Sequence, residues 1–206
     1  MRSSIKKAYF SDYVFDVCGD VYEPAEDSFL FAEHLDIEED ERVLDMGTGC
    51  GILGILAAKK AREVVAVDVN PYAVRCAKQN AQSNYVQDKM YFMRGDLFTS
   101  LNEDKKFDVI LFNAPYLPSE EYEADFWLGR AWAGGATGRN VIDLFISHAP
   151  CHLKQTGRIL LMQSTLSNVE ETQRNFAKWN LNSQVVAERA LPFFETLFLI
   201  EAKFSV

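Results

Sequence analysis

The tetrapeptide Asn113-Ala114-Pro115-Tyr116 combines groups that could hold a planar NH2 group. It follows an apolar, strand-like run, and open α/β sheets build their ligand sites at the carboxyl ends of strands. The Asn113 amide oxygen is an acceptor, and Pro115 biases Ala114 towards an extended conformation that can turn its carbonyl the same way. Tyr116 is available to lie against the bound group. An ordinary turn after a strand has the same composition, so other motifs must decide.

A glycine-rich turn, Gly47-Thr48-Gly49-Cys50-Gly51, provides the second candidate site. Its glycines let the backbone approach a ligand closely. Asp68 ends the next predicted strand about twenty residues later, where a carboxylate can accept hydrogen bonds from both hydroxyls of a ribose. Acidic Asp45 directly precedes the turn, and a carboxylate there suits a cationic amino-acid group better than a diphosphate.

The same turn leaves a second interpretation open. Gly49-x-Gly51-x-x-Gly54 matches the dinucleotide fingerprint, so an enzyme that uses a nicotinamide or flavin cofactor is an alternative. The acid before the turn counts against this alternative, and the tetrapeptide has no group with an obvious role in hydride transfer. Asp96 follows the third strand of the α/β pattern and could bond the exocyclic amine of an adenine, or could be an exposed loop residue.

Strand and helix patterns alternate after the first forty residues, which predicts an α/β fold with a mostly parallel, seven-stranded sheet and helices on both faces. Two closing strands without a helix between them predict an antiparallel pair at one edge. The predicted strands are 13–17, which precedes the sheet, and 43–46, 64–68, 90–93, 107–112, 158–163, 184–187 and 196–202. The predicted helices begin at Pro24, cover 52–60, 71–83 and 141–153, and begin at a capping-box pattern at Ser167.

Length and composition favour one soluble domain over residues 1–206. Hydrophobic residues make up 48% and charged residues 25% of the chain. The net charge of -9 argues against a broad grip on nucleic-acid backbones. No run reaches transmembrane length and no apolar leader opens the chain, so no membrane association is expected. Four dispersed cysteines predict free thiols in a reducing compartment. They are Cys18, Cys50, Cys76 and Cys151.

Taken together, these motifs resemble class I methyltransferases that use S-adenosylmethionine. More narrowly, they resemble HemK-type release-factor glutamine methyltransferases, in the compact branch of eukaryotes and archaea. The resemblance covers nearly the whole chain, although the extra N-terminal helical domain of bacterial members would not fit in this length. It rests on Tyr22-Glu-Pro-Ala-Glu-Asp-Ser-Phe-Leu30, Asp45-Met-Gly-Thr-Gly-Cys-Gly51, Asp68-Val-Asn-Pro71, Gly95-Asp-Leu97, the tetrapeptide, and Ala131-Trp-Ala-Gly-Gly-Ala-Thr-Gly138.

The resemblance implies a Rossmann-like fold, with residues 1–40 as an N-terminal segment that covers the cofactor. It implies catalysis by the tetrapeptide Asn113, Ala114, Pro115 and Tyr116. It implies cofactor binding by Ser28, Asp45, Gly47, Gly49, Asp68, Asp96, Leu97 and Asn113. The family has proline where this chain has Ala114. The backbone carbonyl is kept but proline's stiffness is lost, so we expect weaker preorganisation without loss of activity. A catalytically silent cofactor-binding module is an alternative.

The reaction that the resemblance implies is N5-methylation of the glutamine in the Gly-Gly-Gln loop of a class-1 translation release factor, in the cytoplasm. Methylation of adenine N6 in RNA or DNA and of lysine in histones are alternatives, because an adenine also presents a planar NH2 group and members of this branch are associated with histone lysine methylation. An acidic segment follows the tetrapeptide and would favour a protein with basic surroundings over nucleic acid, with an ordinary solvated loop as the alternative interpretation. It contains Glu120, Glu121, Glu123 and Asp125.

Two further expectations concern partners and metals. The third strand of the sheet, Met90-Tyr91-Phe92-Met93, is apolar at four successive positions and should lie at the outer edge. The resemblance implies that a small zinc-binding activator protein pairs with this edge. His148 and His152 have the i,i+4 spacing that can hold zinc, but near a helix end we expect them to interact with its dipole. No metal is expected in the site.

Overall fold

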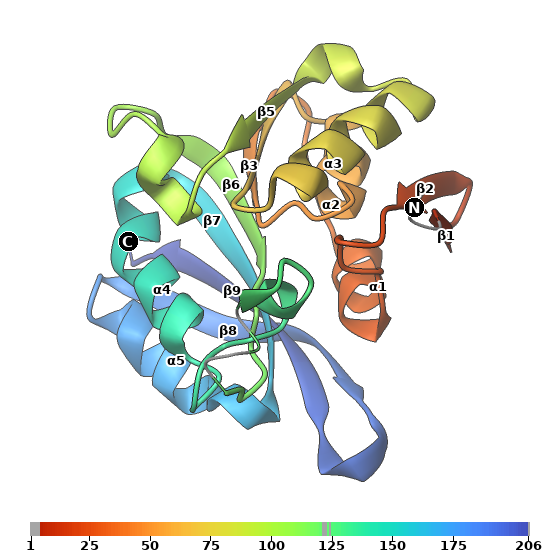
Figure 1. Ribbon diagram of the computed structural model, residues 1–206. Coiled ribbons are helices and arrows are strands. Elements are labelled where there is room, and N and C mark those ends of the chain that lie inside the picture. Colours follow the sequence, from red (N-terminus) through yellow and green to blue (C-terminus); the bar gives the residue numbers. More distant parts are fainter. Residues whose placement is uncertain (1–4, 121–122, 124, 206) are drawn as a thin grey trace.

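The computed structural model describes residues 5–120, 123 and 125–205, and a seven-stranded sheet forms its centre (Figure 1). The strand order is β5-β4-β3-β6-β7-β9-β8. Strands β5, β4, β3, β6 and β7 are parallel, whereas β9 runs antiparallel to both β7 and β8. This confirms the predicted Rossmann-like sheet and its antiparallel C-terminal pair. The strands are β3 (Arg42–Met46), β4 (Glu63–Asp68), β5 (Met90–Arg94), β6 (Phe107–Asn113), β7 (Leu153–Ser164), β8 (Leu181–Ala190) and β9 (Thr196–Phe204).

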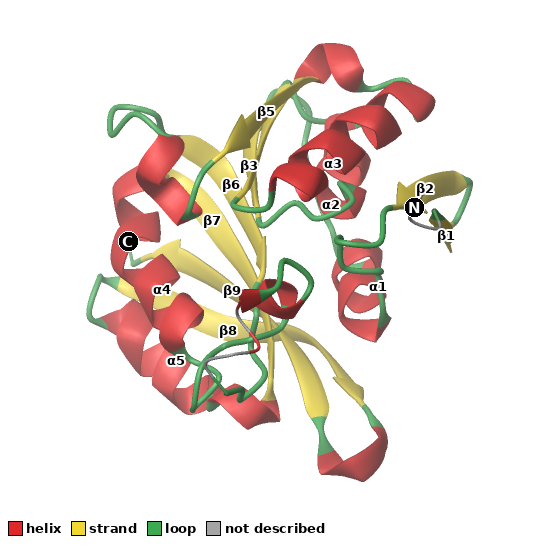
Figure 2. Ribbon diagram, in the orientation of Figure 1, coloured by secondary structure: helices red, strands yellow, loops and turns green. Residues whose placement is uncertain are grey.

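Helices cover both faces of the sheet because alternate strand residues are apolar on both sides. Val43 and Val109 face one apolar layer, and their neighbours Leu44 and Ile110 face the other. Three helices pack on the first face and two on the second (Figure 2). The former are α1 (Glu26–Glu33), α2 (Ile52–Ala58) and α3 (Pro71–Ser83), and the latter are α4 (Asn140–His152) and α5 (Val169–Ala177).

A two-stranded hairpin precedes the sheet, and only its second strand was predicted. It pairs β1 (Lys6–Phe10) with β2 (Tyr13–Val17). In β1 only Ala8 is buried, so its sequence lacks the alternation that identifies a half-buried strand. The hairpin packs on α3, where the Asn80 side chain bonds both the N–H and the carbonyl of Asp16.

Several predicted boundaries were wrong by a few residues. Helix α1 begins at Glu26, so Pro24 lies before the helix and does not open it. Helix α5 is capped by Asn168, whose side chain accepts from the Glu171 N–H, and Ser167 does not act as the cap. Strands β7 and β8 are longer than predicted at both ends, because their outer residues lack the apolar pattern.

Two features of this architecture concern function. Strands β3, β4 and β6 end at the same edge of the sheet, where the glycine turn, Asp68 and the tetrapeptide follow them. The β8–β9 hairpin extends away from the body of the molecule (Figure 1). Within the described part of the chain, no helix has the length and apolar character needed to cross a membrane.

Candidate active site

A cavity of about 430 Å3 opens at the carboxyl ends of β3, β4 and β6. This volume falls within the range of small-molecule and cofactor sites. Every site residue predicted from the sequence lines this one cavity. These residues are Ser28, Asp45, Gly47, Gly49, Asp68, Asp96, Leu97, Asn113, Ala114, Pro115 and Tyr116. The fold therefore brings together motifs that are far apart in the chain, since 88 positions separate Ser28 from Tyr116.

Asp68 is held in a fixed orientation at the end of β4. One carboxylate oxygen accepts the Gly49 N–H at 2.9 Å and the other accepts the Asn70 N–H at 2.8 Å. Gly49 adopts a left-handed φ of +57°, which glycine allows without strain. Burial raises the pKa of Asp68, and the backbone donors oppose that rise. Each oxygen keeps further acceptor capacity, so the carboxylate can still bind a ligand's hydroxyl groups.

Asp45 lies deeper and is only 1% exposed. Its Oδ2 accepts the Thr48 hydroxyl at 2.6 Å and the Gly54 N–H at 3.0 Å. Burial raises the pKa of Asp45 to about 7, although both donors act in the opposite direction. A Cβ on Gly54 would lie 2.7 Å from the same oxygen. This glycine therefore lets α2 pack against the carboxylate, which accounts for its place in the fingerprint without a diphosphate.

The side chain of Asn113 has one end bound and one end unbound. Its amide nitrogen donates to Asp27 Oδ2 and to Ser28 Oγ, each at 3.2 Å. Its amide oxygen is buried and has no hydrogen-bond partner among the described residues. Leaving a buried acceptor unsatisfied costs about 1–3 kcal/mol. The arrangement therefore presents a fixed acceptor that a ligand's N–H group would satisfy.

Asp27 organises this part of the site, and the sequence analysis did not identify it as a site residue. Its buried carboxylate also accepts from the Ser28 N–H at 2.6 Å and the Tyr22 hydroxyl at 3.2 Å. The Tyr116 hydroxyl lies 3.5 Å from its Oδ2. Burial raises the pKa of both tyrosines, and the nearby Asp27 carboxylate adds to the rise. Both hydroxyls thus stay protonated and can donate.

The only sequence signal for Asp27 was its place inside the Tyr22–Leu30 motif, one residue before Ser28. An acid in the first turn of a helix is already explained by the helix dipole, so its contacts across the fold were not apparent. Ser28 was predicted to bind cofactor. The structure puts its hydroxyl between Asp27 and Asn113 while it also lines the cavity.

The segment from Ala131 to Gly138 braces the tetrapeptide. The Leu117 N–H donates to the Trp132 carbonyl at 3.0 Å, and the Gly134 N–H donates to the Leu117 carbonyl at 2.9 Å. A Cβ at Gly138, whose φ is +71°, would lie 2.2 Å from the Tyr116 carbonyl oxygen. Only glycine fits this close approach. Three residues missing from the predicted site complete this wall of the cavity, namely Trp127, Arg130 and Trp132.

Asp96 and Leu97 form another part of the wall. Asp96 is exposed, and its side chain caps the short 3-10 helix η2 (Leu97–Ser100). The Asp96 N–H donates to the Thr99 hydroxyl at 3.1 Å. The predicted contact with an adenine amine stays a prediction, because the residue lines the cavity and also has a structural role as a cap.

Acidic residues flank the cavity in the segment between Leu117 and Trp127, both of which line it. Glu120 and Asp125 are exposed, and Glu123 accepts the Glu120 N–H at 2.8 Å. Glu121 lies outside the described residues. This segment therefore carries negative charge, but its described acids do not line the cavity, whereas Arg130 does. That the acids form the rim stays a prediction.

The two histidines lie away from this cavity and contact the backbone. His148 Nδ1 is 2.9 Å from the Leu144 carbonyl within α4, and His152 Nδ1 is 3.1 Å from the Lys105 carbonyl. Both rings stack on Phe98. His152 lies in the last turn of α4, as the expected interaction with a helix end requires, and His148 lies one turn earlier. The interaction of either ring with the helix dipole stays a prediction.

Comparisons with known proteins find a matching family model and similar proteins. The family model "Methyltransferase small domain" matches residues 23–128. A putative protein N5-glutamine methyltransferase of Methanocaldococcus jannaschii is 43% identical, over 89% of this chain and 91% of that protein. The human methyltransferase HEMK2 is 32% identical, over 74% of this chain and 75% of that protein. The solved E. cuniculi Mtq2–Trm112 complex, described as responsible for methylation of the termination factor eRF1, includes a chain with a TM-score of 0.71 and 26% identity, covering 90% of this chain and 99% of that one.

Proposed function

The chain belongs to the methyltransferase small domain family, and on that premise we propose that it transfers a methyl group from S-adenosylmethionine to the side-chain amide of a glutamine in a protein. The single observation that carries the proposal is the unpartnered oxygen of Asn113. Because its nitrogen is bound to Asp27 and Ser28, this amide can act towards a substrate only as an acceptor. A carboxamide NH2 group is a matching donor.

The cavity has donors and acceptors that suit S-adenosylmethionine. Asp68 has acceptor capacity for the ribose hydroxyls, and Asp45 offers a buried carboxylate near a cationic amino-acid group. Asp96 and Leu97 would border the adenine. When bound, the cofactor supplies an electrophilic methyl group on a positively charged sulfur. The described residues named here would hold the cofactor through hydrogen bonds and charge, without a bound metal ion.

The protein's own contribution is to position a poor nucleophile. An amide nitrogen has a delocalised lone pair, and strong acids or bases offer little help near neutral pH. Asn113 Oδ1 and the Ala114 carbonyl would accept one N–H each and fix the direction of the nitrogen. Positioning of this kind can supply about 7–11 kcal/mol in favourable cases. The aromatic side chains of Phe112, Trp127 and Trp132 line the cavity and would keep water out.

The substrate is a class-1 translation release factor, methylated at the glutamine of its Gly-Gly-Gln loop. Support comes from the names of the relatives: the M. jannaschii protein is called a glutamine methyltransferase, and the E. cuniculi complex is described as acting on eRF1. The exposed acids Glu120 and Asp125 lie in the segment between the cavity-lining Leu117 and Trp127, and would repel the phosphates of RNA or DNA and favour a basic protein surface. An enzyme that modifies a translation factor would work in the cytoplasm.

A small activator protein pairs with the edge strand β5. The sheet order confirms that this strand is outermost, and its second residue, Tyr91, is 57% exposed. A groove of about 500 Å3 runs beside it and is lined by Met90 to Met93 with Lys78 and Gln82. The E. cuniculi relative was solved with the partner Trm112. The same proposal includes zinc binding by this activator.

The experiment that tests this function offers the enzyme and labelled cofactor a release factor, histones, and single- and double-stranded nucleic acids in parallel. Mass spectrometry then locates the added methyl group. We expect a methylated glutamine in the release factor and no transfer to nucleic acid. Efficient methylation of adenine or lysine, with none on the release factor, would overturn the proposal.

A further inference from the structure

The tip of the β8–β9 hairpin exposes two adjacent phenylalanines. Phe193 and Phe194 are fully exposed, at 96% and 103%, more than any other large apolar side chain in the described part of the chain. Scattered exposed apolar residues need no explanation, but two neighbouring aromatic rings at one tip form a concentrated apolar contact. Figure 1 shows that this tip projects beyond the sheet and its helices.

The backbone holds both rings outward in an unusual conformation. Phe193 and Phe194 have φ values of +62° and +65°, in the left-handed region that bulky residues rarely adopt. The Leu191 N–H donates to the Glu195 carbonyl at 2.8 Å and closes the turn. Such local strain is characteristic of ligand-binding and functional segments. The turn therefore holds both phenylalanine rings in an outward-facing position.

The base of the hairpin is paired with helix α1. Arg189 of β8 pairs with Glu26 at 2.9 Å and with Glu33 at 2.6 Å, both on α1. Leu191 packs partly against the core. Helix α1 also carries Asp27 and Ser28, which orient Asn113. The base of the hairpin is thus paired with the helix whose residues orient the catalytic amide.

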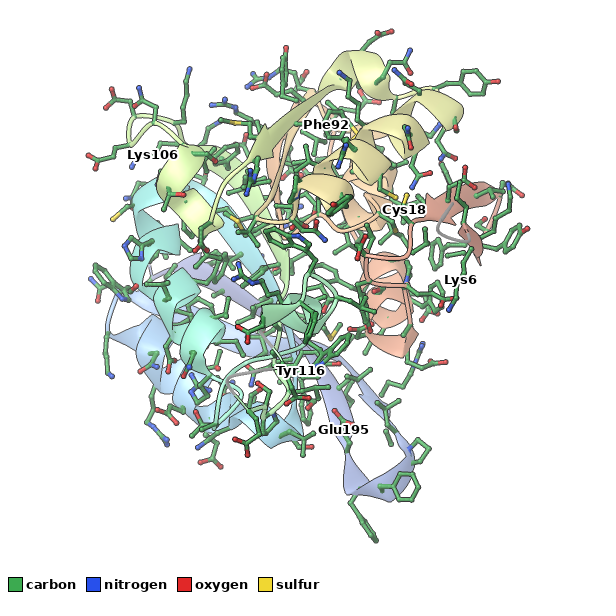
Figure 3. All side chains as sticks on the ribbon, in the orientation of Figure 1. Lys6, Cys18, Phe92, Lys106, Tyr116 and Glu195 are labelled. Carbon is green, nitrogen blue, oxygen red and sulfur yellow. The ribbon has the colours of Figure 1, made fainter. Side chains whose placement is uncertain are left out.

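The tip of the hairpin lies at the edge of the sheet on which the cavity opens, because β9 begins beside the carboxyl end of β7. Burial raises the pKa of Tyr116, and Asp27, Tyr22 and then the Glu195 carboxylate add to the effect. Glu195 directly follows the two phenylalanines, and Figure 3 shows it close to Tyr116. A protein that inserts a side chain into this cavity therefore approaches the edge of the sheet from which the tip projects.

We propose that Phe193 and Phe194 anchor the folded protein that presents the methyl-accepting side chain, by entering an apolar pocket beside its acceptor loop. This inference rests on the proposed function and specifies how the substrate protein is recognised. Aromatic rings can also stack on bases of single-stranded nucleic acid, but such sites combine rings with cations. The tip from Leu191 to Thr196 carries only one charge, the negative Glu195. The observations therefore favour a protein.

The test compares an intact release factor with a short synthetic peptide that contains its Gly-Gly-Gln loop. The variant is the double substitution Phe193→Ser/Phe194→Ser in the full chain. Because both side chains are exposed, it should fold normally. Tyr85→Ser is the matched control, since Tyr85 is an 88% exposed aromatic at positive φ at the C-terminal end of α3, outside the cavity lining. Cofactor affinity, kcat and KM are measured for each substrate.

We expect the double variant to raise KM for the intact release factor by at least about tenfold, the effect of losing an interface hot spot. Its kcat, its kinetics with the peptide and its cofactor affinity should match those of the wild type and of Tyr85→Ser. An equal rise in KM for both substrates, or no rise for either, would overturn the anchor proposal and leave the proposed function standing. If the wild type modifies neither substrate, the proposed function fails and the anchor with it.

Two other occupants of the tip are tested in the same experiment. If the double variant loses affinity for single-stranded RNA while its release-factor kinetics are unchanged, the tip binds nucleic acid and the proposal is wrong. Light scattering examines a second copy of this chain as the occupant. We expect the tip substitutions to leave the molecular mass unchanged. A wild-type dimer that becomes a monomer in the double variant would contradict the proposal.

Discussion

The amide nitrogen of Asn113 lies 3.2 Å from Oδ2 of Asp27, a residue 86 positions earlier in the chain. This contact decides which end of the Asn113 amide a substrate meets. With the nitrogen bound, the buried oxygen remains as an acceptor without a partner among the described residues. Orientation by α1 therefore prepares the end of β6 for an NH2 group.

Substitution of Asp27 should separate catalysis from cofactor binding. In Asp27→Asn the new amide could donate to Asn113, so the Asn113 side chain would no longer have one preferred orientation. We expect kcat to fall by roughly 10- to 100-fold, the scale of a misplaced reactant, with cofactor Kd within a few-fold. Steady-state kinetics and calorimetry measure both values, and thermal unfolding verifies the fold.

The matched control for this variant is Glu26→Gln. Glu26 is the neighbouring acid on α1, is exposed, and pairs with Arg189 without touching Asn113. Its kcat should stay near that of the wild type. Equal kcat values for Asp27→Asn and wild type would show that Asp27 does not position the catalytic amide.

Cofactor binding should depend on Asp68. Asp68→Ala removes the carboxylate that is held by the Gly49 and Asn70 N–H groups. We expect the binding free energy of S-adenosylmethionine to weaken by at least about 1.5–3 kcal/mol, the scale of lost hydrogen bonds to a charged group. Calorimetry measures the change, with Asp104→Ala in an exposed loop as the control. Unchanged affinity, or tighter binding of NAD, would contradict the assignment.

Cofactor affinity should also rise with pH through about 7. Asp45 has a pKa of about 7 in the folded protein against an ordinary value of 3.8, because burial disfavours its charged form. A cationic ligand favours the ionised carboxylate, so affinity should increase about tenfold between pH 6 and pH 8. The difference between wild type and Asp45→Asn isolates this contribution from the cofactor's own titration. Identical pH profiles for the two proteins would refute it.

The same shift predicts how Asp45 affects stability without cofactor. Between pH 3.8 and about 7 the folded state holds a proton that the unfolded state releases. The stability that Asp45 contributes is therefore complete below the lower value and is lost as pH rises through the folded pKa. Chemical denaturation across this window should show a smaller fall in unfolding free energy for Asp45→Asn than for wild type.

The edge strand makes a separate prediction about the activator. Tyr91→Asp places a charge on an exposed position of β5, where it should block pairing with another chain. We expect that the activator no longer co-purifies with the Tyr91→Asp variant. The residues that bind the cofactor are unchanged by this substitution. The control is Val186→Asp on β8, at the other edge of the sheet. Retention of the complex by Tyr91→Asp would exclude this docking site.

Most of the fold could be predicted from the sequence because its signals are local. The apolar runs of β3, β4 and β6 and the glycines after Met46 identify strands and turns without knowledge of their neighbours. Strand β1 could not be found in this way. Only its Ala8 is buried, and its stability comes from pairing with β2 and from the packing of that hairpin on α3.

The sequence predicted the site residues that directly follow a strand. It missed those whose role depends on contacts between distant segments of the chain. Asn113 was expected to offer its oxygen, but nothing local indicates that Asp27 fixes the nitrogen. Trp127 and Trp132 line the cavity only because their segment folds back on Leu117. Such long-range contacts leave no periodicity in the sequence.

The measurement that tests the central claim most directly compares wild type and Asn113→Ala on a release factor with S-adenosylmethionine. Mass spectrometry follows methylation of the Gly-Gly-Gln glutamine, and calorimetry follows cofactor binding. We predict that Asn113→Ala keeps cofactor affinity within a few-fold and loses most of its turnover, because only the substrate's acceptor is removed. Methylation of that glutamine by Asn113→Ala at the wild-type rate would contradict the account.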